Sequence, residues 1–141
     1  MPMLTRKYIL LSILFILTPP LGAGLLIWTA HKLSVDIEAA VLSNILWPTM
    51  SLVFLAALIG WAVFLRRPKR LSDGVKAGLL TVFLCYLFGP IPLAIEAGSW
   101  DGVLGVAKFH GMVFVFGQIV SFWVAYPIGA LFGRWIAKRM L

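Results

Sequence analysis

The sequence predicts an all-α integral membrane protein, a bundle of four transmembrane helices with both termini in the cytoplasm. Three observations support this fold class: long intervals without charge, a high apolar content and an alternation of basic and acidic loops. No Asp, Glu, Lys or Arg occurs in residues 8–31, 39–65, 77–95 or 109–133. Each interval holds about the ~20 apolar residues that a helix needs to cross a ~30 Å hydrocarbon core.

The composition excludes an ordinary soluble domain. Apolar residues make up 62% of the 141 residues and charged residues only 12%, whereas a soluble domain carries about 25% charged residues. Four spans and their short loops use the whole chain. We therefore predict one membrane domain over residues 1–141, with spans at approximately 8–30, 41–65, 75–97 and 109–136.

The distribution of basic residues predicts the topology. Ten of the twelve Lys and Arg residues fall in three clusters, at 6–7, 66–76 and 134–139, and the two remaining intervals hold the acidic residues at 36, 38, 96 and 101. Short loops rich in Lys and Arg stay in the cytoplasm. Both termini and the middle loop are therefore predicted to be cytoplasmic, which explains the net charge of +7 without nucleic acid. The compact chain favours a bacterial inner membrane.

Prolines and glycines interrupt the predicted spans in chain order. The first span contains Pro19-Pro20, where a kink is expected because proline removes a backbone donor. This segment also resembles a signal peptide, but its apolar run continues through Trp28, which favours a retained helix. The second span has Pro48 near its outer end, and the fourth has Pro127 in its inner half. Pro90 and Pro92 break the third span after Gly89.

Small residues recur at a spacing of four, which lets helix backbones approach closely in lipid. Packing within the bundle is the simpler interpretation of these pairs. The alternative is that the Gly129–Gly133 face packs against another subunit. The pairs are Ala56 and Gly60, Gly74 and Gly78, and Gly129 and Gly133.

Glu96 is the only acidic residue near a predicted membrane interior. Intramembrane carboxylates are costly and mark ion or proton pathways, and broken helices beside such groups are typical of transporter sites. Glu96 also lies close to the outer end of its span, where it can reach the headgroups. Both interpretations stay open at this point.

Two histidines lie toward the outer surface, His31 after the first span and His110 at the start of the fourth. They are possible axial ligands of a haem, although their spacing is not diagnostic and two interfacial histidines are the simpler interpretation. Gln118 is a polar residue inside the fourth span, where side-chain bonds between helices are expected. No cofactor and no metal site is predicted.

The inner loop carries Arg66, Arg67, Lys69 and Arg70, which can contact anionic lipid headgroups. The chain has a single cysteine, Cys85, and therefore lacks the pair that thiol–disulfide exchange requires. We find no catalytic triad, no paired carboxylates at depth and no phosphate loop, and we predict that the protein is not an enzyme.

Three functions remain compatible with these patterns. The first is an accessory or interaction protein, of the partner-subunit or immunity type, that acts through helix packing against a membrane-protein partner or a second copy. The second is a small dimeric transporter or channel that uses Glu96 and the broken third helix. The third is a haem or quinone anchor subunit that uses His31 and His110.

Overall fold

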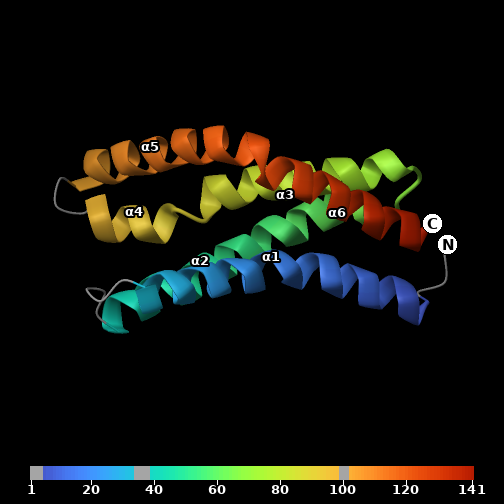
Figure 1. Ribbon diagram of the computed structural model, residues 1–141, viewed down its shortest axis with the longest axis horizontal. Helices are drawn as coiled ribbons and strands as arrows, with labels where there is room; N and C mark the ends of the chain where they lie inside the picture. Colours follow the sequence, from blue (N-terminus) through green and yellow to red (C-terminus); the bar gives the residue numbers. More distant parts are fainter. Residues whose placement is uncertain (1–4, 34–38, 99–101) are drawn as a thin grey trace.

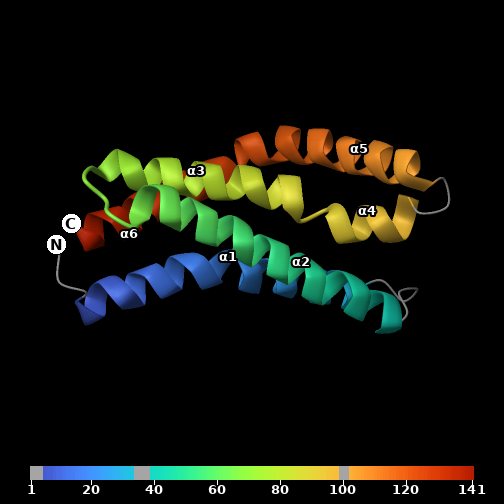
Figure 2. The ribbon, with the colours of Figure 1, turned by 180° about the vertical axis from the view of Figure 1, so that it is seen from behind.

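The computed structural model describes residues 5–33, 39–98 and 102–141, and the regular elements in these ranges are all helices (Figure 1). In chain order they are α1 (Arg6–Leu33), α2 (Ala39–Gly60), the π-helix η1 (Trp61–Leu65), α3 (Leu71–Phe88), α4 (Ile91–Gly98), α5 (Gly102–Trp123) and α6 (Ala125–Met140). Figure 2 shows α2 crossing between α1 and α3.

Four segments are long and apolar enough to cross a membrane, as the uncharged intervals predict. They are Arg6–Thr29, Asn44–Leu65, Leu71–Glu96 and Gly102–Val120. Helix α1 begins and helix α6 ends at the same end of the molecule (Figure 1), as expected for an even number of spans.

The fourth segment differs from the predicted span at 109–136. It begins earlier, at Gly102, and the helix is interrupted at Val124, whose φ of −123° and ψ of −63° are not helical. The cause is Pro127, which has no N–H to donate to the carbonyl of Trp123 four residues earlier. The predicted single span is therefore two helices, α5 and α6, that meet at an angle.

Glycines bring α3 and α6 into backbone contact. A Cβ atom added at Gly74 would overlap the carbonyl oxygen of Gly133, and one added at Gly78 would overlap the carbonyl oxygen of Gly129. The two helices are thus antiparallel, with these glycines opposite one another. Because α3 covers the Gly129–Gly133 face, that face is not open to another subunit, and the simpler interpretation of packing within the bundle describes the geometry.

The other side of α3 packs against the second helix. A Cβ atom at Gly60 would lie 3.1 Å from the carbonyl oxygen of Ala77 and would overlap the hydroxyl of Thr81. Ala56, one turn before Gly60, is fully buried. Small residues therefore line two sides of α3, and this helix occupies the centre of the bundle.

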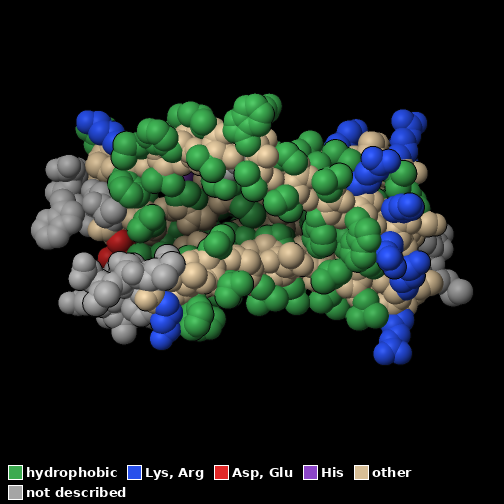
Figure 3. Space-filling model, in the orientation of Figure 1, with side chains coloured by type: hydrophobic (Ala, Val, Ile, Leu, Met, Phe, Trp, Pro, Cys, Tyr) green, Lys and Arg blue, Asp and Glu red, His purple; other side chains and the backbone are tan. Residues whose placement is uncertain are grey.

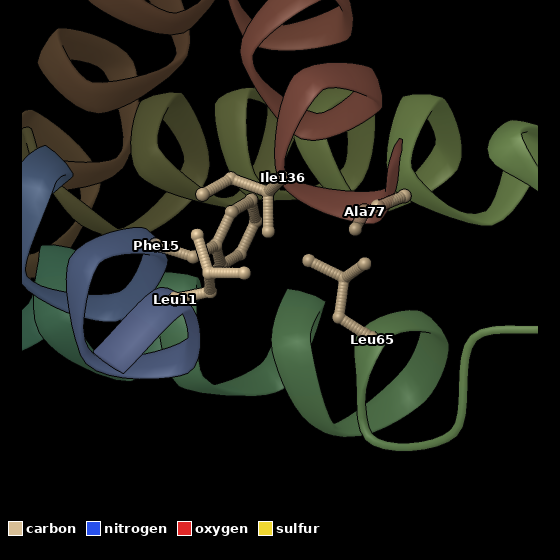
Figure 4. Packing of buried hydrophobic residues seen from close by; sticks show 6 residues of the cluster. Leu11, Phe15, Leu65, Ala77 and Ile136 are labelled. Carbon is tan, nitrogen blue, oxygen red and sulfur yellow. The ribbon is translucent and has the colours of Figure 1, made fainter. Parts of the chain in front are cut away.

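The best-buried apolar cluster lies where α1, η1, α3 and α6 meet (Figure 4). Phe15 is 1% exposed and Leu65 and Ile136 are 0% exposed. Figure 4 shows the side chains of Phe15, Leu65 and Ile136 directed toward one another. Two hydrogen bonds tie α1 to η1 beside this cluster: Trp61 Nε1 donates to Ser12 Oγ at 2.9 Å, and the Tyr8 hydroxyl lies 3.1 Å from the Leu65 carbonyl oxygen.

This part of the molecule carries most of the positive charge, and we call it the basic end (Figure 3). The loop between η1 and α3 is ordered by Asp73, whose carboxylate accepts the backbone N–H groups of Lys69 at 2.7 Å and Arg70 at 2.9 Å. Its exposed Lys and Arg residues are Arg6, Lys7, Arg66, Arg67, Lys69, Arg70, Lys76, Arg134, Lys138 and Arg139. The opposite end, with Lys32, Glu96 and Lys108, is called the far end.

Candidate functional site

A cleft of about 710 Å³ opens between α1 and the α5–α6 pair, and Figure 3 shows the hollow on the face toward the viewer. Its walls come from five parts of the chain: residues 18–27 of α1, 45–53 of α2, 81–93 of α3 and α4, Val113 of α5, and 124–132 of the α5–α6 junction and α6. Its volume lies within the roughly 300–1,000 Å³ of small-molecule pockets.

Two helix interruptions and one proline pair border this cleft. Pro19 and Gly22 line it from α1, Gly89 and Pro90 line it from the α3–α4 junction, and Val124 lines it from the α5–α6 junction. Proline interrupts the hydrogen bonding of a helix and changes its direction. The cleft therefore lies where the third and fourth spans are interrupted and where the continuous helix α1 carries its two prolines.

Where the third span is interrupted, side chains of neighbouring helices form hydrogen bonds with its backbone carbonyls. Pro90 and Pro92 have no N–H, so the helical hydrogen-bond ladder cannot continue through the Gly89–Pro90 junction. His110 Nε2 on α5 lies 2.6 Å from the carbonyl oxygen of Leu87, and the Thr49 hydroxyl on α2 lies 3.4 Å from that of Gly89. Backbone groups that lack a partner within their own helix need hydrogen bonds of this kind when they are shielded from water.

This contact gives His110 a structural role. A carbonyl oxygen only accepts hydrogen bonds, so Nε2 carries the proton and donates to Leu87, and only Nδ1 is left for another ligand. His31 lies in α1, but its side chain is outside the described residues. A haem shared by the two histidines stays a prediction. In the described part of the chain, no group of three or more His, Cys, Asp and Glu residues is placed to hold a metal ion.

Gln118 holds the α5–α6 junction. The Tyr126 hydroxyl on α6 donates to Gln118 Oε1 on α5, across the interruption at Val124. The amide nitrogen of Gln118 is buried without a hydrogen-bond partner. The bond between helices that the sequence predicts for Gln118 is therefore one between two halves of the same span.

Glu96 does not line the cleft. It lies in α4, toward the far end, and its side chain is exposed. Pro90 lines the cleft, whereas Pro92 is buried outside the lining. The structure thus places the broken third helix at the cleft and the carboxylate of Glu96 beyond it. All four basic loop residues at 66, 67, 69 and 70 are exposed at the basic end.

The polar groups of the cleft are largely engaged with the protein itself. The Thr18 hydroxyl donates to the carbonyl of Leu14 at 2.6 Å, and that of Thr49 is bound to Gly89. The Thr81 hydroxyl has no hydrogen-bond partner and packs against Gly60. The remaining walls are mostly aliphatic and aromatic, together with Cys85 and Tyr86. The cleft therefore presents an apolar surface.

A second feature is the outer face of α5. None of the residues in Gly102–Val120 is buried, whereas each of the other three candidate spans contains buried residues. A Cβ atom added at Gly111 meets no atom within 4 Å, and Ala107, four residues earlier, is exposed. The exposed large apolar residues of this helix include Leu104, Met112, Val115, Phe116, Ile119, Val120 and Phe122. In the folded chain, α5 is the span with the most open surface.

The sequence patterns do not predict the cleft, although they include the prolines that lie near it. The prolines at 19, 90 and 127 are visible in the sequence, but their convergence depends on how the helices pack. Thr49, which bonds the broken junction, has no distinctive pattern around it. Gly111 is one of 13 glycines, and only the structure separates it from those buried between helices.

Comparisons with protein-family models, with curated proteins and with solved structures found no match to this chain. We therefore infer the function from the cleft, the outer face of α5 and the two ends of the bundle.

Proposed function

We propose that this chain is a non-catalytic subunit of a membrane complex and that it acts by packing α5 against a partner protein. The partner is either a larger membrane protein or a membrane-acting toxin that the chain neutralises. The observation that carries this proposal is the absence of any buried residue in the Gly102–Val120 span. The other spans each bury part of their surface inside the bundle, and α5 keeps its surface available.

The open glycine on α5 supports the same interpretation. Helix association in lipid depends on close van der Waals packing, and small residues four apart permit it. Inside the bundle such residues are covered, as at Gly74 and Gly78, but Ala107 and Gly111 are not. An uncovered pair of this kind on the least buried span fits a helix from a second protein.

The basic end supports a cytoplasmic position for both termini, because Lys and Arg near span ends are retained on that side. We place the protein in a bacterial inner membrane with Arg66, Arg67, Lys69 and Arg70 at the cytoplasmic headgroups. A reporter fused after Leu141 is expected to be active in the cytoplasm. Activity on the opposite side would contradict this orientation.

A transporter is the second candidate, and the broken α3–α4 junction at the cleft is the observation in its favour. Broken helices at a binding cavity are common in transporters. The exposed position of Glu96 outside the lining weighs against this carboxylate as the coupling group. We therefore rank the packing function first.

The test replaces Gly111 with leucine. Because a Cβ atom there meets nothing within 4 Å, the substitution leaves the fold intact and blocks only a helix that approaches from outside. In mild-detergent purification from native membranes, the wild type is expected to carry a stoichiometric membrane-protein partner. Gly111→Leu is expected to lose it while keeping its abundance and thermal stability.

Gly22→Leu is the matched control, because Gly22 is also a helical glycine with open space around its Cβ position but lies on α1. This variant is expected to keep the partner. Recovery of the wild type as a single chain, or an unchanged partner in Gly111→Leu, would contradict the proposed function.

A further inference from the structure

A ladder of stacked rings runs from the core to the surface of α6 at the basic end. The ring of Phe15, which is 1% exposed, stacks on that of Phe132, with 6.1 Å between their centres and 5° between their planes. Phe132 stacks in turn on Trp135, at 6.2 Å and 16°. The guanidinium of Arg139 lies 4.8 Å from the centre of the Trp135 ring. A surface cation is therefore supported by three rings that begin in the buried core.

The guanidinium of Arg139 has an aromatic neighbour but no anionic one. Among the described residues, no ion pair or hydrogen bond involves this side chain. Arginine packs on aromatic rings with the face of its guanidinium, whereas its N–H donors point outward in the plane as a fork that matches two oxygens of a phosphate. The contact with Trp135 therefore leaves these donors available to an anion from outside the chain.

The other cations of α6 strengthen the attraction for an anion. Lys138 is adjacent to Arg139 in the last turn, and Arg134 lies one turn before Lys138; all three side chains are exposed. The helix contains no Asp or Glu. The C-terminus of a helix carries roughly half a negative charge, which three positive charges exceed. The end of α6 therefore attracts anions.

Exposed apolar side chains precede these cations on the same side of α6. Leu131, Trp135 and Arg139 follow one another at a spacing of four residues, which places them on one helix face. Leu131 is 66% exposed and Trp135 is 41% exposed. A tryptophan beside basic residues at the end of an apolar stretch is typical of the headgroup level of a membrane. A ligand that fits this face has an apolar part along Leu131 and Trp135 and a negative group at Arg139.

The basic loop between η1 and α3 differs from this face. The carboxylate of Asp73 accepts the backbone N–H groups of Lys69 and Arg70, so it adds a negative charge beside the cations of the loop. Within the described residues, Arg139 is the cation of the basic end that lies over an aromatic ring. The loop stays a predicted headgroup contact, whereas α6 holds its cation in a fixed place above an apolar surface.

We propose that the outer face of α6 at the basic end binds one anionic phospholipid. Arg139 and Lys138 hold its phosphate, and its acyl chain lies along Trp135 and Leu131. The contacts are electrostatic and apolar, and no covalent step is involved. The site lies on a different helix from the outer face of α5 and does not depend on the protein partner proposed there.

The test measures retained lipid by native mass spectrometry of the purified full-length chain in detergent. The protein is exposed to phosphatidylglycerol and diacylglycerol with the same acyl chains, and the wild type is expected to retain phosphatidylglycerol in preference. Arg139→Gln is expected to weaken phosphatidylglycerol retention roughly fivefold. Arg67→Gln, the matched control, removes one exposed charge from the loop at the same end and is expected to retain the lipid as the wild type does.

Two further variants keep the charge and test the geometry. Trp135→Leu removes the ring beside the Arg139 guanidinium and is expected to weaken phosphatidylglycerol retention roughly twofold. Arg139→Lys replaces the planar fork with a compact ammonium at the exposed surface, so its result does not depend on how well the Trp135 variant folds. It is also expected to weaken retention. A surface that attracts lipid by charge alone would respond to neither change.

Four results would overturn the proposal. Equal losses in Arg139→Gln and Arg67→Gln would show that the basic end attracts lipid through its overall charge. Unchanged retention in both Trp135→Leu and Arg139→Lys would lead to the same conclusion. Equal retention of the two lipids by the wild type would exclude the phosphate contact. Loss of the membrane-protein partner in Arg139→Gln, with lipid retention unchanged, would show that a protein covers this face. Because the readout is lipid mass, the test is independent of whether Gly111→Leu loses a protein partner.

Discussion

At the basic end α3 and α6 touch through backbone atoms, whereas toward the far end a cleft separates α1 from the α5–α6 pair. Phe15 and Ile136 in the closed part are 1% and 0% exposed, but Leu26 and Leu93 on the cleft walls are 73% and 39% exposed. Glycines at matched positions permit the close approach, and prolines produce the separation. Two residue types that both weaken soluble helices therefore have opposite effects on the packing of this bundle.

The closed part and the open part also satisfy their backbone differently. In the closed part α3 and α6 run as uninterrupted helices past their glycine contacts, and the Tyr8 hydroxyl bonds to the Leu65 carbonyl at the end of η1. At the cleft the interrupted junction depends on His110 and Thr49 from neighbouring helices. We expect the closed part to determine stability.

The largest expected effect is that of Gly78→Leu in the closed part. The new side chain would overlap the carbonyl of Gly129, and backbone at this crossing cannot move without separating α3 from α6. Overpacking of a well-packed core typically costs about 1–3 kcal/mol and occasionally more, and we expect the upper part of this range. The measurement is thermal unfolding of the purified protein in detergent.

Gly111→Leu is the control for this prediction, because it adds the same side chain to a helical glycine whose Cβ position is open. We expect its unfolding temperature to match that of the wild type. Equal destabilisation by the two variants would mean that the closed part does not determine stability, and the comparison of the two parts would fail.

A smaller effect is expected from Thr49→Val at the repaired junction. Valine keeps the shape of threonine but removes the donor to the Gly89 carbonyl, and a buried carbonyl left without a donor costs about 1 kcal/mol or more. The measurements are thermal stability and the amide-exchange rate of α4. We expect faster exchange of α4 relative to α3, since the junction before α4 loses its hydrogen bond to α2.

Ser51→Ala is the matched control on the same helix. The Ser51 hydroxyl is exposed and bonds locally to the Trp47 carbonyl at 2.9 Å, so its removal is expected to change stability by no more than about 0.5 kcal/mol. If Thr49→Val also stays within this limit, the hydrogen bond to Gly89 is not what holds the junction.

The architecture could be predicted from the sequence because charged side chains are excluded from hydrocarbon. The uncharged intervals therefore predict the four apolar helices, and the structure contains four segments long and apolar enough to cross a membrane. The interruption near Gly89 follows from its neighbouring prolines and is also confirmed. The division of the fourth helix at Val124 was not predicted, because a proline inside a long apolar run can be accommodated by a bend or by a break.

The sites were harder to predict from the sequence because they depend on distances between helices. The spacing of Gly129 and Gly133 predicts a packing face but does not say which helix covers it. The sequence favours an interfacial histidine at His110 over a haem ligand, and only the structure shows the Leu87 carbonyl oxygen 2.6 Å from its Nε2. The walls of the cleft come from helices that are distant in the sequence, so no local pattern describes it.

The smallest expected effect is that of Glu96→Gln, which separates the packing function from the transporter. The side chain of Glu96 is exposed and lies outside the cleft lining, so loss of its charge is expected to change stability by no more than about 0.5 kcal/mol. Insertion, abundance and retention of the partner protein should match the wild type. A transporter that used Glu96 as its coupling group would instead lose activity while inserting normally, since intramembrane carboxylates carry the transported charge in such proteins. Proton or ion flux in vesicles that contain the purified protein decides between them. Flux in the wild type that Glu96→Gln abolishes would reverse our ranking, and it would move the functional centre from the outer face of α5 to the far end of the open part.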